Sequence, residues 1–76
     1  MGVPKRLTEM QRRFAELLVL HEGRKFDYEC AVEAGYSENR ARQEASELQN
    51  PEQSPLVVKY IGELREEQRN RFKVNY

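Results

Sequence analysis

The sequence lacks the features of a disulfide-bonded, membrane-spanning or secreted protein. It has one cysteine, Cys30, which excludes an internal disulfide and a cluster of thiolate metal ligands. No apolar run approaches the roughly 20 residues that a membrane-spanning helix needs. No apolar segment follows the basic residues 1–13, so no signal peptide is expected. These absences favour a reduced, cytoplasmic compartment and no membrane partner.

Net charge is absent too, because the 13 basic and 13 acidic residues balance, but they are unevenly spread. Residues 1–26 carry six basic and three acidic groups, a net of +3. Residues 27–54 carry two basic and seven acidic groups, a net of −5, and residues 55–76 carry five and three, a net of +2. Phosphate contacts dominate the affinity of proteins for nucleic acid. Binding to nucleic acid would therefore be helped by the two ends and opposed by the middle.

Nothing in the sequence indicates catalysis. The 76 residues allow one small domain, which buries only about 60% of the surface of the unfolded chain and has little room for an enclosed active site. There is no glycine-rich phosphate loop, and Cys30 has neither a second cysteine nor a nearby histidine to supply metal-ligand spacing or a base. The prediction is a protein that is not an enzyme and uses no cofactor or metal.

The apolar residues recur at helical spacing, without strict alternation, and predict an all-α domain of four helices. The first helix is expected to begin at Thr8, where Gln11 completes a capping box, and to end at Gly23. Its apolar stripe is Leu7, Met10, Phe14, Leu17, Leu18 and His21. The second helix is expected to start with Asp27 as its cap and to end at Gly35. Its narrow face of small residues consists of Cys30, Ala31 and Ala34.

The segment 34–37, Ala-Gly-Tyr-Ser, predicts a sharp turn between two short helices. Gly35 can adopt the left-handed conformation that ends a helix, and Ser37 is a preferred cap for the next one. Only about two residues would then separate the helices, which is typical of a helix-turn-helix. The third helix would run over 38–48, with Ala41, Ala45 and Leu48 inward, until Asn50-Pro51 breaks it.

The fourth helix is expected to begin at Ser54-Pro55, with serine as the cap and proline at the first helical position. Its inner face would consist of Leu56, Val57, Tyr60, Ile61 and Leu64. The sequence then becomes highly charged. We therefore divide the chain into a basic N-terminal arm (1–7), a helix-turn-helix domain (8–64) and a charged C-terminal helix extension or linker (65–76).

Three ordered segments resemble the phage terminase small subunit. They are Leu-Thr-Glu-Met-Gln-Arg-Arg-Phe at 7–14, Ala-Val-Glu-Ala-Gly-Tyr-Ser at 31–37, and Ala41 with 45–48, Pro55 and 60–61. The resemblance covers roughly residues 7–64. It implies an N-terminal helix-turn-helix domain that binds double-stranded viral DNA at a packaging start site, in the cytoplasm of the host cell. It also implies two partners, a homo-oligomeric ring formed by a more C-terminal region of the full-length protein and a terminase large subunit.

The third helix would be the recognition helix, with its N-terminal residues facing base edges. Asn39 and Gln43 could pair with adenine, Arg40 or Arg42 with guanine or phosphate, and Ser37 could hold a phosphate. Further candidate contacts are Lys5 and Arg6 in the arm and Arg24 and Lys25 in the first loop. The alternatives are a solvated helix face, a disordered basic tail and ordinary loop charge.

Two other roles stay open at this point. A small helix-turn-helix transcription regulator would bind a palindromic operator as a stable dimer. A protein-interaction module would dock the third or fourth helix onto a partner such as a packaging-motor subunit, and the zero net charge and the acidic middle favour that role. For single residues, Tyr36 is expected to pack in the turn, His21 to pack or cap its helix, and Cys30 to be a small buried side chain.

Overall fold

The structure is a computed structural model that describes the backbone of residues 6–72 and the side chains of residues 6–70. Within that range the chain forms four α-helices and no strand, which confirms the predicted all-α class. They are α1 (Glu9–Leu20), α2 (Asp27–Ala34), α3 (Ala41–Leu48) and α4 (Pro55–Phe72). None of the described helices combines the length and the apolarity that a membrane span requires.

The start of α1 is the predicted capping box. The Gln11 amide donates to the Thr8 hydroxyl (3.1 Å), and the Thr8 amide donates to the Gln11 side chain (3.0 Å). The expected end at Gly23 is wrong by three residues, because the helix stops at Leu20 and His21 occupies the C-cap. Gly23 has a φ of 82°, which lets the chain turn back so that the amide of Arg24 reaches the His21 carbonyl (2.8 Å).

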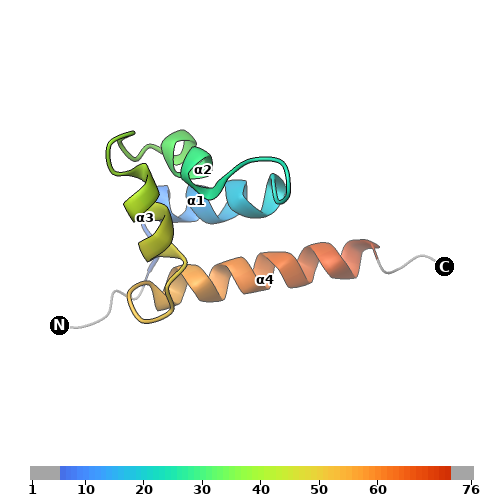
Figure 1. Ribbon diagram of the computed structural model, residues 1–76. Helices are drawn as coiled ribbons and strands as arrows, with labels where there is room; N and C mark the ends of the chain where they lie inside the picture. The colour runs from blue at the N-terminus through green and yellow to red at the C-terminus, as the bar shows by residue number, and fades with distance from the viewer. Residues whose placement is uncertain (1–5, 73–76) are drawn as a thin grey trace.

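Helices α1 and α4 run side by side and in the same direction (Figure 1). Two polar contacts join α4 to α1 and to the loop that follows α1, in the same order along both segments. The Tyr60 hydroxyl donates to Glu16 (2.8 Å), and Arg65 forms an ion pair with Glu22 (2.6 Å). The charged sequence after Leu64 continues α4 without interruption, and its first residue contacts the loop just after α1.

Helix α4 begins as the sequence predicted. Pro55 is its first residue, and the amide of Val58 donates to the carbonyl of Ser54 (3.0 Å), as expected of a capping position. The preceding loop is shaped by Asn50, whose side chain accepts from the Glu52 amide (2.9 Å) and whose carbonyl accepts from the Ser54 amide (2.8 Å). Asn50-Pro51 thus ends α3 and redirects the chain towards α4.

The core lies where the four helices meet. Its largest members come from α1 and α4, whereas α2 and α3 contribute mostly alanine. The buried residues are Phe14, Ala15, Leu18, Val19, Cys30, Ala31, Ala34, Ala41, Ala45, Leu48, Val57 and Ile61. The predicted inward faces of α2 and α3 are confirmed. The predicted stripe of α1 missed Ala15 and Val19, because α1 is covered on one side by α2 and on another by α4.

Candidate nucleic-acid interface

The α2–α3 unit, defined as residues 26–49, holds most of the predicted contacts. Helix α3 crosses steeply beside α2 and descends towards the start of α4 (Figure 1). Ala31, Ala34, Ala41 and Ala45 are all 0–1% exposed. Because these side chains are small, the two helices pack closely, and the polar residues of α3 remain on the outside.

The connection between α2 and α3 is longer than the sequence suggested. Gly35 has a φ of 118° and occupies the C-cap of α2, as predicted, and the Tyr36 amide returns to the Ala31 carbonyl (3.0 Å). The prediction that Ser37 caps α3 is wrong. Residues 37–40 form a separate turn, in which the Arg40 amide donates to the Ser37 carbonyl (3.1 Å), and α3 begins only at Ala41.

This correction changes the setting of five candidate residues, all of which are exposed. Ser37, Asn39 and Arg40 lie on the turn, not on a helix, and Arg40 occupies the N-cap of α3 without a side-chain capping bond. Only Arg42 and Gln43 lie on the first turn of α3. The structure therefore brings the five residues 37, 39, 40, 42 and 43 to one end of α3, as a turn followed by a helix.

The start of α2 also differs from the prediction. Phe26 is the N-cap residue, and its amide donates to the Glu29 carboxylate (3.1 Å), whereas Asp27 is the first helical residue. The Asp27 carboxylate is not a cap but an acceptor for the side-chain amide of Gln49 at the end of α3 (2.9 Å). Gln49 also donates to the Ala45 carbonyl (3.0 Å), so one side chain links the two helices.

Three of the predicted contact residues bind the protein's own carboxylates. Lys25 lies 2.6 Å from Glu33, and Arg40 lies 3.4 Å from Glu44. The Gln43 side-chain amide donates to Glu47 (3.0 Å). The hydrogen bond between Lys25 and Glu33 is the main cause that raises the pKa of Lys25 and lowers the pKa of Glu33. These pairs are at the surface, so water and salt weaken them and a competing phosphate can exchange for the carboxylate.

Arg42 has a different kind of partner. Its guanidinium lies over the ring of Tyr28, 4.3 Å from the ring centre. The ring of Phe26 stacks on Tyr28 as well, with centroids 5.7 Å apart and planes inclined by 9°. Neither aromatic residue is among the contacts predicted from the sequence. The Phe-x-Tyr spacing at 26–28 was visible in the sequence, but the approach of Arg42 depends on the packing of α3 against α2.

The remaining candidates lie outside the α2–α3 unit, in the N-terminal arm and in the first loop. Arg6 and Arg24 are exposed. Lys5 lies outside the described residues. As expected, Tyr36 packs against the core, His21 caps α1 and Cys30 is 1% exposed. Burial raises the pKa of both the Cys30 thiol and the Tyr36 phenol, as expected of neutral packing groups.

A groove between α2 and the start of α3 is lined by side chains of both positive and negative charge. Its residues are Lys25, Tyr28, Glu29, Val32, Glu33, Glu38 and Arg42. Three carboxylates therefore surround the two cations and the tyrosine. This groove is the part of the α2–α3 unit least suited to a phosphate backbone, because carboxylates repel it.

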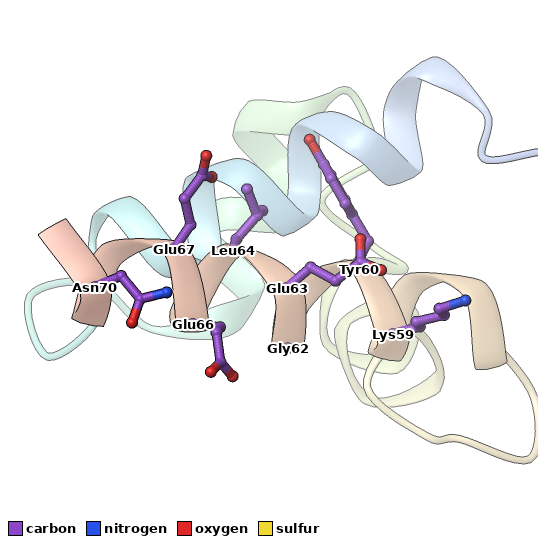
Figure 2. Close-up of a pocket in the computed structure, with 8 residues that line it drawn as sticks. All are labelled: Lys59, Tyr60, Gly62, Glu63, Leu64, Glu66, Glu67 and Asn70. Carbon is purple, nitrogen blue, oxygen red and sulfur yellow. The ribbon is translucent and has the colours of Figure 1, made fainter.

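A second hollow follows the length of α4 and is more acidic still (Figure 2). The side chains of Tyr60 and Leu64 point towards α1, whereas Glu66 points away from it. With Glu63 and Glu67 also in its lining, the hollow has three carboxylates and one lysine, Lys59. This charge makes the outer side of α4 a poor surface for nucleic acid.

No further kind of site is apparent in the described part of the chain. Within it, no three His, Cys, Asp or Glu side chains are grouped as ligands for a metal ion. Comparison of the sequence with protein-family models matched none, and searches among curated proteins and solved structures found no similar protein.

Proposed function

We propose that this chain binds double-stranded viral DNA, with the α2–α3 unit acting as a helix-turn-helix, and that it serves in genome packaging as the DNA-recognition part of a terminase small subunit. The observation that carries the proposal is the group of exposed polar residues at the N-terminal end of α3. Ser37, Asn39, Arg40, Arg42 and Gln43 combine amide, hydroxyl and guanidinium groups, the donor types that contact base edges and phosphates.

The arrangement of the other helices supports this role. Helix α3 packs on α2, and α2 in turn packs on α1, so the polar end of α3 is held on a rigid support. In a helix-turn-helix the second helix of the pair enters the major groove with its N-terminal residues near the bases. The sequence resemblance over residues 7–64 supplies the viral context and the packaging role.

The net charge of the chain and the pairing of its cations determine how strongly it is expected to bind DNA. A single copy has no net charge, and its Lys25 and Arg40 are engaged with Glu33 and Glu44. We therefore expect one copy to bind duplex DNA weakly, in about the 10⁻⁴ to 10⁻⁶ M range of non-specific complexes. Several copies linked in a ring, as the resemblance implies, would raise the effective concentration and the overall affinity.

The test is a titration of the protein with a 20-base-pair duplex, followed residue by residue by NMR at low and moderate salt. Amide signals of residues 37–43, Arg24 and Lys25 should shift, and the shifts should weaken as salt rises, because phosphate contacts release counterions. Unchanged signals at low salt would refute the DNA-binding role.

Two variants with the same loss of charge separate local contact from net charge. Arg24→Gln removes a cation from the first loop. Arg12→Gln removes one from α1 on the side that faces Tyr60 and α4. Arg24→Gln should weaken binding more than Arg12→Gln and should reduce the salt dependence. Equal effects would mean that overall charge, and not this surface, attracts the DNA.

One observation favours a second role, the docking of a protein partner such as the terminase large subunit. The groove between α2 and α3 is bordered by Glu29, Glu33 and Glu38 around Tyr28 and Val32, which is suited to a segment with basic and apolar side chains. In that case the NMR shifts would follow addition of the large subunit and not of DNA.

A further inference from the structure

Phe26 is more exposed than an aromatic side chain ordinarily is in a small helical protein. It is 67% exposed and occupies the N-cap of α2. Its ring is nevertheless ordered against Tyr28, nearly parallel and 5.7 Å away between centroids. Tyr28 is half-buried and packs against the core. Phe26 thus contributes little to the core, and what it does instead is cover one part of the Tyr28 ring.

The Tyr28 ring in turn holds Arg42. The guanidinium carbon lies 4.3 Å from the ring centre, within the distance of a cation–π interaction. Such a contact uses the flat face of the guanidinium, whereas its N–H donors lie in the plane of the group and point outward at its edge. A contact of this kind can hold Arg42 over the ring without consuming its hydrogen-bond donors.

This distinguishes Arg42 from two other cations among the predicted contacts. Lys25 and Arg40 each lie against a carboxylate, at 2.6 and 3.4 Å. Among the described residues, Arg42 forms no ion pair, although Glu29 and Glu38 line the same groove. Those carboxylates repel phosphate, so the surroundings of Arg42 favour a neutral base edge over the DNA backbone.

We propose that Arg42 reads a guanine in the major groove and that Tyr28 and Phe26 are positioning residues for it. This rests on the proposed DNA-binding function and adds the base that is recognised. Guanine presents two acceptors, O6 and N7, that match the paired donors of one guanidinium. A guanidinium already fixed on an aromatic ring loses less side-chain freedom when it binds than a free one does.

The experiment selects bound sequences from a pool of randomised duplexes, using the wild type, Arg42→Lys, Tyr28→Phe and Tyr28→Leu. The wild type should enrich a guanine at one position, and Arg42→Lys should lose about 5-fold to 150-fold of that preference, the range of one bidentate pair. Tyr28→Phe keeps the ring and should keep the preference. Tyr28→Leu should lose about 2-fold to 5-fold of it, as expected of one exposed cation–π contact.

A second measurement identifies the atoms. The selected duplex is resynthesised with 7-deazaguanine at the enriched position, which removes N7 as an acceptor. Wild-type affinity should fall, whereas the affinity of Arg42→Lys should change less. The salt dependence of Tyr28→Leu should equal that of the wild type, because no phosphate contact is removed.

Tyr36→Leu is the control for altered folding, since Tyr36 is another half-buried tyrosine of the same unit that packs on the core. Circular dichroism should show all variants helical, and Tyr36→Leu should retain the guanine preference. If Tyr36→Leu and Tyr28→Leu lose it equally, the effect is one of folding and the positioning role is wrong. If the wild type binds duplex DNA without preferring guanine, Arg42 is not the reader while DNA binding stands. If it binds no DNA at low salt, both proposals fail.

Discussion

The two halves of this molecule use side chains of different size for different purposes. The α1–α4 pair buries Phe14, Leu18 and Ile61. At its edge, Tyr60 of α4 contacts α1 and Arg65 contacts the loop just after α1. The α2–α3 unit is packed mainly through alanines and Leu48, and two of its large side chains, Phe26 and Arg42, lie outside. Helices α1 and α4 therefore bury the larger apolar side chains and supply most of the hydrophobic stabilisation. Helices α2 and α3 bury smaller side chains, pack closely and leave a polar surface exposed.

The largest expected effect compares two phenylalanines, one from each half. Phe14→Ala should lower the free energy of unfolding by about 3–5 kcal/mol, because it removes a fully buried ring and leaves a cavity. Phe26→Ala should change it by no more than about 0.5 kcal/mol, as for most exposed positions. Urea denaturation followed by circular dichroism measures both, and similar losses would show that Phe26 also supports the fold.

The next comparison concerns two glycines. Gly35→Ala should destabilise by roughly 1–2 kcal/mol, because φ is 118° and a side chain is strained there whatever the space around it. Gly62→Ala in α4 should stabilise by about 0.5–1 kcal/mol, since a Cβ there meets nothing within 4 Å and alanine favours the helix. Thermal unfolding gives the two signs, and a stabilising Gly35→Ala would contradict the observed turn.

A third variant should change the affinity for DNA while leaving the free energy of unfolding almost unchanged. Glu33→Gln removes the carboxylate that engages Lys25. Stability should change little, because the pair is at the surface. Affinity for a 20-base-pair duplex at low salt should rise, because Lys25 becomes available and one negative charge is lost. Glu66→Gln on the outer side of α4 is the control with the same change of charge. Equal gains in affinity from both variants would show that Lys25 does not contact the DNA.

The smallest effect concerns the contact between α1 and α4, and it depends on pH. The hydrogen bond from Tyr60 to Glu16 raises the pKa of Tyr60 above its ordinary value near 10. The folded state therefore holds the phenol proton more tightly than the unfolded state. The contribution should be complete below about pH 10 and disappear as the pH rises through the folded pKa. The difference in melting temperature between wild type and Tyr60→Phe should follow that course, and a difference that does not fall as the pH rises above 10 would exclude this cause.

Much of the fold could be predicted from short-range chemistry. The Thr8–Gln11 box, Pro55 and the alanine faces of α2 and α3 each depend on residues within one or two helical turns, and all appear in the structure. The start of α3 could not be predicted this way. Ser37 has the chemistry of a cap, but Tyr36 is packed against the core and the chain makes a further turn before α3 begins.

The details of the candidate site depended on contacts between distant residues. Gln49 reaches Asp27 across 22 positions, and Arg42 reaches Tyr28 only because α3 packs against α2. Of the predicted cations, Arg6, Arg24, Arg40 and Arg42 are exposed and Lys25 is half-buried. The sequence did not indicate that Lys25 and Arg40 would face carboxylates, because opposite charges eight or four residues apart can pair or remain solvated with almost equal free energy.

The alanine packing of α3 affects which substitutions the protein can accept during evolution. Helix α3 is anchored by Ala41, Ala45 and Leu48, and the positions between them face solvent. Substitutions at Arg42, Gln43 or Ser46 would leave those anchors untouched, so new surface chemistry need not be matched by a new interior. The exposed side chains of α3 can therefore be exchanged without repacking the core, and under the proposed function the sequence that this protein binds could change while its fold stays the same.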